Sequence, residues 1–366
     1  MAININNMTT GAPNINAISP DNATDYHTTC FRPENAEWVF DYQPIYMWFI
    51  FVLGFIENLF VISIFILHKS RCTVAEIYLG NMAAADLIFV SGLPFWAIYI
   101  SNRFYWPFGG FMCVAVNSFI QLNFYSSIYF LMMVSIDRYL ALVKTMSFGR
   151  MRRPWCAKVT CAIIWTFAIA VSLPKVVFRR VVFIESFNTT ACIIMAPSDT
   201  WHIVTNIIAN IVGFVIPVIV IAFCTFQIIG VLRNNAMQQF KEINNEKKAT
   251  WLVLSVLLVF IICWLPFHIF TFLDTLDLLQ YFTSCAAAMA IEIGNQISSY
   301  IAFSNSCINP LLYVIVGNHF RRKAKEVYQH HLTRFKSQKN MSLPMNYSGV
   351  TARTSISMGQ QNLIRQ

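Results

Sequence analysis

The amino-acid sequence predicts an all-α membrane protein: a seven-transmembrane helix bundle with a short amphipathic cytoplasmic helix and disordered termini. Seven long segments rich in Leu, Ile, Val, Phe and Met follow one another through residues 45–316, separated by short polar stretches. Each can cross a hydrocarbon core of ~30 Å, which takes about 20 helical residues. The composition agrees, because 57% of the residues are hydrophobic and only 12% are charged, against about 25% charged in a soluble domain.

The hydrophobic pattern places the seven spans in order, and their length favours helices over the shorter alternating strands of a membrane barrel. The spans are residues 45–68, 76–100, 110–143, 155–177, 200–232, 247–275 and 288–316. Outside the bundle (45–316) we expect an N-terminal segment (1–44), a membrane-surface helix (317–330) and a C-terminal tail (331–366). An odd number of spans puts the two chain ends on opposite sides of the membrane.

Positive charge predicts the orientation of the bundle. Lys and Arg concentrate in the stretches after the first, third and fifth spans and in the C-terminal tail. By the positive-inside rule the C-terminus is cytoplasmic and the N-terminus is extracellular. The net charge of +9 then reflects topology and the anionic inner leaflet, so we expect membrane lipids as partners and no nucleic acid.

The predicted outer face carries sites for covalent modification. Three Asn-X-Ser/Thr sequons for N-glycosylation lie there, at Asn7, Asn22 and Asn188. Four of the ten cysteines are also external, and they allow two disulfides in three possible pairings. These cysteines are Cys30, Cys113, Cys192 and Cys285.

Polar side chains inside the spans are costly and need a reason. Lone Asn and Ser residues can simply join helices through hydrogen bonds. That interpretation fails for Asp86 in the middle of the second span, because a carboxylate there needs a cation or a proton. The third span ends in Asp137-Arg138-Tyr139, where the Arg can fold back on the Asp at the cytoplasmic boundary.

With one such motif on each span, the chain resembles the rhodopsin-like G-protein-coupled receptors over nearly its whole length. The motifs are Asn58, Asn81-Met82-Ala83-Ala84-Ala85-Asp86, Asp137-Arg138-Tyr139, Trp165, Pro217, Cys263-Trp264-Leu265-Pro266 and Asn309-Pro310-Leu311-Leu312-Tyr313. Longer stretches are similar to the kinin receptors, and the cytoplasmic ones favour type 2 of that family over type 1. These stretches include Cys72–Asn81, Leu93–Ile98, Asp137–Met146, Val231–Asn235, Thr271–Leu276 and Thr354–Ser357.

The resemblance implies a bradykinin-like kinin as the ligand, a short peptide with Arg at each end. It implies that Asp274 and Glu292 pair with the N-terminal Arg, although the family has Asp at the second position. Gln121 stands where type-1 receptors carry a Lys and type-2 receptors a Ser, so we expect the intact peptide to be accepted. Aromatic residues are expected to line or floor the pocket: Trp96, Trp106, Phe124, Tyr125, Trp264, Phe267 and Tyr300.

Charge supports a cationic ligand independently of the resemblance. Ten acidic residues and only five Lys or Arg lie on the predicted outer face. Such a face attracts a cationic peptide and speeds its encounter. A merely solvated acidic surface is the alternative explanation.

The resemblance also implies the internal machinery of a receptor. It pairs Cys113 with Cys192 and Cys30 with Cys285. It places an internal sodium ion, an allosteric modulator and the sole candidate cofactor, among Asp86, Asn123, Ser127 and Asn305. The implied activation switches are Asp137, Arg138, Tyr139, Trp264, Pro266, Asn309, Pro310 and Tyr313.

The implied partners are a heterotrimeric G protein, mainly of the Gq class with Gi as a second class, receptor kinases and arrestin. Gq coupling would activate phospholipase C and raise intracellular calcium. Tail residues are candidates for phosphorylation: Ser342, Ser348, Thr351, Thr354, Ser355 and Ser357. The tail lacks the Cys that family members usually carry for palmitoylation.

A kinin receptor at the plasma membrane has three alternatives. A receptor of the same class for a different cationic peptide fits the same charges. An ion-coupled transporter could use Asp86 as a relay, but the two halves of the chain show no internal repeat. An enzyme is not expected, because no phosphate loop, nucleophile elbow or metal-ligand spacing is present in the sequence.

Overall fold

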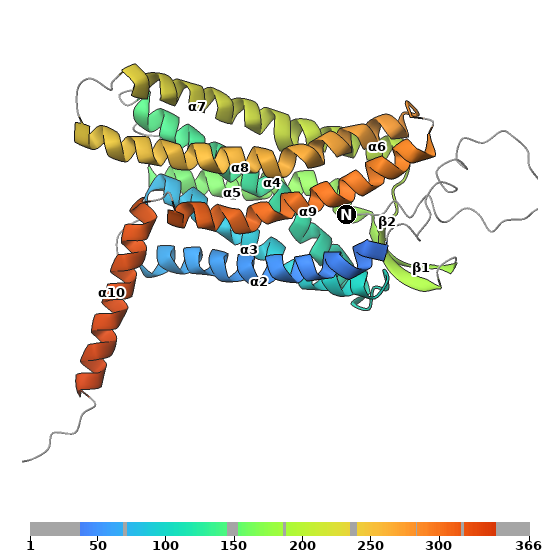
Figure 1. Ribbon diagram of the computed structural model, residues 1–366, viewed down its shortest axis with the longest axis horizontal. Helices are drawn as coiled ribbons and strands as arrows, with labels where there is room; N and C mark the ends of the chain where they lie inside the picture. Colours follow the sequence, from blue (N-terminus) through green and yellow to red (C-terminus); the bar gives the residue numbers. More distant parts are fainter. Residues whose placement is uncertain are drawn as a thin grey trace, which may run out of the picture.

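The computed structural model describes residues 37–68, 72–144, 153–185, 188–234, 240–282, 284–315 and 318–341. Long helices lie side by side along one axis, with a β-hairpin at one end of the bundle and α10 (Asn318–Met341) leaving it at the other (Figure 1). The helices of the bundle are α2 (Glu37–Leu67), α3 (Val74–Ser101), α4 (Gly109–Leu142), α5 (Pro154–Val177), α6 (Asp199–Asn210), η5 (Ile211–Val215), α7 (Ile216–Asn234), α8 (Phe240–Leu278) and α9 (Cys285–Ile315).

The helices confirm the predicted seven-helix bundle. Six stretches of the described chain are long and apolar enough to cross a membrane: Phe40–Leu67, Val74–Ser101, Gly109–Leu142, Pro154–Val177, Asp199–Val231 and Leu254–Leu278. The seventh helix, α9, has 31 residues and packs against α8 and α2 (Figure 1). Its buried face is unusually polar, with Ser298, Ser299, Asn305, Ser306 and Asn309.

Local sequence signals set several helix boundaries. Thr73 caps α3 in a capping box, in which the Thr73 side chain accepts from the Glu76 amide and the Glu76 side chain accepts from the Thr73 amide. Pro154 occupies the first turn of α5, where a missing N–H costs nothing. The Ser198 side chain caps α6 by accepting from the Trp201 amide.

A π-helical segment, η5, interrupts the fifth span. It precedes Pro217, which has no N–H to donate to the carbonyl four residues earlier. The Tyr129 hydroxyl of α4 donates to the Val212 carbonyl of η5 at 3.0 Å. Gly213 lets α4 approach closely, because a Cβ there would lie 2.6 Å from Cε1 of Phe124. The bulge is therefore joined to α4 by both packing and a hydrogen bond.

One element of the described chain is not helical. Strands β1 (Arg179–Ile184) and β2 (Thr189–Ile194) form an antiparallel hairpin after α5, with Val181 opposite Cys192. Both strands are rich in β-branched residues, which favour a pleated conformation. The stretch lies between the predicted fourth and fifth spans, 155–177 and 200–232, so hydropathy did not indicate it.

The ends of several elements differ from the predicted ones. Helix α2 begins at Glu37, within the predicted N-terminal segment, and α8 begins at Phe240 instead of residue 247. Helix α10 continues to Met341, past the predicted end at residue 330. The sequence has no Gly or Pro between Asn318 and Met341, so no residue there interrupts the helix.

Some predicted modification sites lie outside the described residues. They are Asn7, Asn22, Cys30, Ser342, Ser348, Thr351, Thr354, Ser355 and Ser357. Asn188 is described: it is exposed and has a φ of 46° in the turn between β1 and β2.

Candidate functional site

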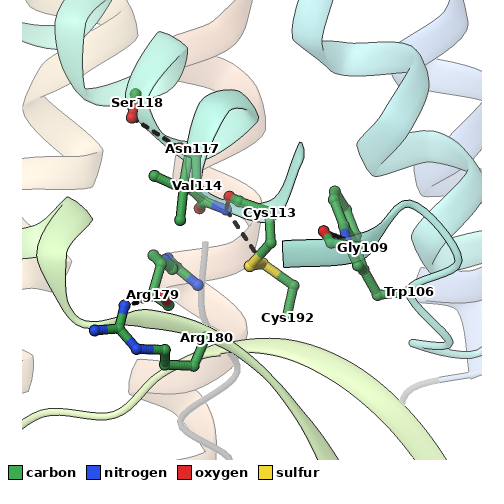
Figure 2. The surroundings of a disulfide bond; sticks show 9 residues. All are labelled: Trp106, Gly109, Cys113, Val114, Asn117, Ser118, Arg179, Arg180 and Cys192. Carbon is green, nitrogen blue, oxygen red and sulfur yellow. Dashed lines mark hydrogen bonds between the residues drawn. A yellow bond between two sulfur atoms is a disulfide. The ribbon is translucent and has the colours of Figure 1, made fainter. Parts of the chain in front are cut away.

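A disulfide anchors the hairpin to the N-terminal end of α4 (Figure 2). It joins Cys113 to Cys192, with Cα atoms 5.7 Å apart, which confirms this predicted pairing. Asn117 supports it, because its Nδ2 donates to the Cys113 carbonyl at 2.7 Å and lies 3.5 Å from Cys192 Sγ. The Trp106 amide also donates to the Thr190 carbonyl of β2 at 2.8 Å. Cys285 is disulfide-bonded as well, and Cys30, its predicted partner, lies outside the described residues.

The two predicted acids lie near the C-terminal end of α8 and the N-terminal end of α9, which pack against each other. Asp274 of α8 accepts a hydrogen bond on Oδ2 from Asn206 Nδ2 of α6, at 2.8 Å. Glu292 of α9 accepts on Oε1 from Gln296 Nε2 at 3.2 Å, and Gln296 Oε1 accepts from the Tyr300 hydroxyl at 3.1 Å. The carboxylates of Asp274 and Glu292 are close enough to repel each other. The structure thus brings both acids together and adds two amide partners that we did not predict.

One cation lies close to Asp274, and a second cation lies close to the first. Lys175, at the C-terminal end of α5, interacts electrostatically with both Asp274 and Arg179. Arg179 begins β1 and is buried, and that burial lowers the pKa of its guanidinium to about 10. Arg179 therefore stays charged at neutral pH. Counting charges in the sequence could not show that Arg179 is buried or that Lys175 lies beside Asp274.

An aromatic cluster forms the floor below the acids. Trp264 of α8 meets Phe124 of α4 edge-to-face at 5.1 Å, and Phe267 at 5.8 Å. His268 is buried beside them, stacked on Phe214 at 4.3 Å, and its Nδ1 lies 2.9 Å from Asn210 Oδ1. His268 was not predicted, and it joins α8 to α6 directly above the predicted switch residue Trp264.

The remaining predicted pocket residues are spread over two regions. Trp96 is buried in a separate cluster with Tyr99 and Trp106, with ring centroids 5.3 and 6.3 Å from its own. That cluster lies in the apolar core around the disulfide, apart from the Trp264 floor. Gln121 is partly exposed on α4, about two helical turns beyond Cys113.

Asp86 of α3 lies at the centre of a buried polar cluster. Its Oδ1 accepts hydrogen bonds from Asn123 Nδ2 at 2.7 Å, Ser306 Oγ at 2.9 Å and Ser127 Oγ at 3.3 Å. Its Oδ2 accepts from Asn309 Nδ2 at 3.4 Å. Three helices, α3, α4 and α9, therefore meet at one carboxylate. Ser306 and Asn309 complete the cluster, although we did not assign either to the predicted ion site.

Several buried Asn side chains in α2 and α9 have an amide oxygen that accepts no hydrogen bond. Within the described chain, the buried Oδ1 atoms of Asn58, Asn305 and Asn309 have no partner. Among the described residues, Asn309 is bonded to Asp86, whereas Asn305, a predicted ion ligand, is not among the donors to that carboxylate. An unpartnered buried acceptor is costly and suits a cation or a water molecule. The Asp86 carboxylate and the adjacent Asn309 are oxygen donors of the kind that a hard cation such as sodium prefers.

The predicted switch residues lie at several places in the bundle, and Asp137, Arg138 and Tyr139 lie near the C-terminal end of α4. Arg138 Nη2 lies 3.5 Å from Asp137 Oδ2, and the Asp137 side chain is only 3% exposed. Tyr139 packs against Phe223 of α7 with ring centroids 5.9 Å apart. Asn309 contacts Asp86 as described above, and α9 continues through Pro310 and Tyr313. Pro266 lies inside α8, two residues after Trp264.

Comparison with known proteins identifies relatives of the whole bundle. The family of 7 transmembrane receptors (rhodopsin family) matches residues 57–313. The chain is 54% identical to the B2 bradykinin receptor of Cavia porcellus, over 91% of this chain and 90% of that protein. It is also 54% identical to the B2 bradykinin receptor of Homo sapiens, over 93% of this chain and 87% of that protein. Identity to the B1 bradykinin receptor of Tupaia minor is 40%, over 82% of this chain and 87% of that protein.

Proposed function

Because this chain belongs to the rhodopsin family of seven-transmembrane receptors and, within it, to the bradykinin receptors, we propose that it binds intact kinin peptides and couples mainly to Gq. It is a multi-pass membrane receptor and not an enzyme. In this proposal the end with the β-hairpin faces the outside, and the end with α10 faces the cytoplasm (Figure 1). Peptide binding outside would raise intracellular calcium inside through phospholipase C.

The acidic pair carries the proposal. Asp274 and Glu292 lie on adjacent helices that pack against each other, so one guanidinium can contact both carboxylates. The N-terminal Arg of a kinin also carries an α-ammonium, and the two positive charges match the two acids. The peptide's C-terminal carboxylate also needs a cation, and Lys175, which interacts with Arg179 as well as with Asp274, is the proposed one.

Gln121 supports preference for the peptide that retains its C-terminal Arg. A Lys at this position of α4 would repel that Arg, whereas a neutral amide does not. The partly exposed Gln121 side chain lies on the helix that also carries Cys113 and Phe124, between the disulfide and the aromatic floor.

Signal transfer is proposed to use the packed floor and the Asp86 cluster. A peptide that presses on Phe267 or His268 also acts on Trp264, which contacts both rings and lies two residues before Pro266. Movement of α8 at this Pro would let Arg138 leave Asp137 and meet the G protein. Sodium bound by Asp86, Asn305 and Asn309 would favour the inactive arrangement, because it joins α3 to α9.

The G-protein and arrestin contacts extend beyond the described residues. The predicted coupling stretches, 144–153 and 233–248, are described only in part, and the Ser and Thr of the tail lie outside. Gq is proposed as the main partner and Gi as the second. Receptor kinases would phosphorylate the tail, and the added negative charge would bind arrestin.

A calcium assay tests ligand class and coupling together. Cells that display the chain on their surface receive bradykinin or the peptide without its C-terminal Arg. We expect calcium release with the intact peptide only, abolished by a Gq inhibitor. A surface-expressed chain that answers neither peptide would refute the kinin assignment and leave a receptor for another cationic peptide. Ion uptake into liposomes that contain the purified chain would instead favour the transporter.

Competition binding tests the acidic pair. Replacing Asp274 and Glu292 together with Ala should weaken intact bradykinin more than about tenfold, because a buried charge contact is lost. The exposed outer-face acid Asp199 provides a matched control, and Asp199→Ala should leave affinity nearly unchanged. Equal affinity in both variants would contradict the proposed pose.

A further inference from the structure

Helix α10 contacts the bundle through one face. Phe320, Lys323 and Val327 are buried and recur at helical spacing. The Phe320 ring meets Phe65 edge-to-face at 5.7 Å and Phe60 at 6.1 Å, both on α2. The rest of this part of α10 is exposed at Arg321, Arg322, Lys325 and Glu326.

A buried ion pair lies within this contact. Lys323 Nζ is 2.9 Å from Glu76 Oε2, and the two side chains are only 5% and 8% exposed. The same Glu76 oxygen accepts from the Thr73 amide at 2.7 Å, so the capping box at the start of α3 fixes its position. Glu76 and Lys323 are hereafter the docking pair.

A second contact lies beside the docking pair, and its acidic partner faces water. Glu326 Oε2 is 2.7 Å from His68 Nε2, and the Glu326 side chain is 52% exposed whereas the His68 side chain is 10% exposed. Arg322 also approaches Glu326, at 3.8 Å. Exposed contacts of this kind contribute little, whereas removing one partner of a buried pair leaves an uncompensated charge. The docking pair should therefore dominate the position of α10.

An acyl chain on a nearby Cys is another way to hold a helix such as α10 at the membrane. No Cys occurs between Cys307 and Gln366, so this stretch has no thiol that could carry a thioester-linked acyl chain. We propose that the docking pair holds α10 against α2 and α3 and takes the place of such a lipid anchor in positioning the helix. This inference does not depend on which ligand the receptor binds.

Hydrogen exchange of the full-length chain in lipid nanodiscs tests the proposal. Lys323→Met keeps the length and apolar stem of the side chain but removes its charge. We expect the amides of α10 to exchange more than about tenfold faster in this variant, because Glu76 is left buried without its cation. Glu326→Gln is the matched control and should change exchange less than about twofold.

A double-mutant cycle separates the ion pair from general damage. Glu76→Gln removes the charge and retains the capping box, in which Gln also serves. Combined with Lys323→Met it should restore much of the protection, because no unpaired charge remains. Additive losses, or equal losses in Lys323→Met and Glu326→Gln, would overturn the docking role.

Neutral hydroxylamine, which cleaves thioesters, tests the other half of the proposal. Treatment should leave exchange in α10 unchanged in the parent protein. Faster exchange after treatment would mean that an acyl chain elsewhere on the protein holds the helix, and the proposed replacement of a lipid anchor would be wrong.

Discussion

Gly294 of α9 lies directly against the Phe270 ring of α8. A Cβ on Gly294 would lie 2.0, 2.3 and 2.4 Å from Cε1, Cζ and Cδ1 of Phe270. Ordinary carbon contacts are about 3.5–4.0 Å, so Gly294→Ala requires the ring or the helix to move by more than about 1 Å. Glu292 lies two residues away on the same helix, so such a movement also changes its position relative to Asp274.

The expected cost is the difference between two opposing effects. Overpacking a close contact costs about 1–3 kcal/mol, and three ring atoms inside contact distance place Gly294→Ala at the upper end. The gain in helix propensity from Gly to Ala returns at most about 1 kcal/mol. We therefore expect a net loss of about 2 kcal/mol and weaker kinin binding.

Thermal unfolding of the purified receptor in detergent measures this loss. Gly230→Ala is the matched control, because a Cβ at Gly230 of α7 meets nothing within 4 Å, so this change should be neutral or slightly stabilising. Phe270→Ala by itself lowers stability because it leaves a cavity. When Phe270→Ala is already present, adding Gly294→Ala should lower stability almost no further, because the ring that the new Cβ would meet is gone. Two results would refute the steric argument. One is a melting temperature of Gly294→Ala equal to that of Gly230→Ala. The other is an equal loss from Gly294→Ala in the parent protein and in the Phe270→Ala background.

Three further changes test other parts of the molecule. Gln121→Lys should shift preference by about tenfold toward the peptide without its C-terminal Arg, measured by competition binding, and an unchanged ratio would contradict its placement in the pocket. Asp86→Asn should abolish the effect of sodium on agonist affinity, and a persistent effect in Na⁺ against K⁺ buffers would place the ion elsewhere. Tyr129→Phe should lower stability by about 0.6–1 kcal/mol, because the Val212 carbonyl loses its donor; an unchanged melting temperature would show that this hydrogen bond adds nothing.

The helices could be predicted because the membrane imposes a simple rule. A span must be long, apolar and internally hydrogen-bonded, so hydropathy alone locates it. Interruptions of that rule were harder to predict. The π-helical segment η5 depends on Pro217 and on a donor from Tyr129 of another helix. The hairpin β1–β2 lies in the connection between α5 and α6, where hydropathy gives no signal.

The candidate sites were predicted residue by residue but not as networks. Asp86, Asn123 and Ser127 were expected to cluster, and they do. Ser306 of α9 bonds the same oxygen but had no distinguishing sequence signal, because buried Ser residues usually join helices by bonding their own backbone.

Sequence by itself determined the membrane fold, the order of the spans and the identity of the charged and polar residues that a nonpolar environment makes costly. Only the tertiary structure decided which of them meet: Asp274 with Asn206, Asp86 with Ser306, and Glu76 with Lys323. The physical reason is range. Hydropathy and helix propensity act over neighbouring residues, whereas these contacts join distant parts of the chain through the packing of whole helices.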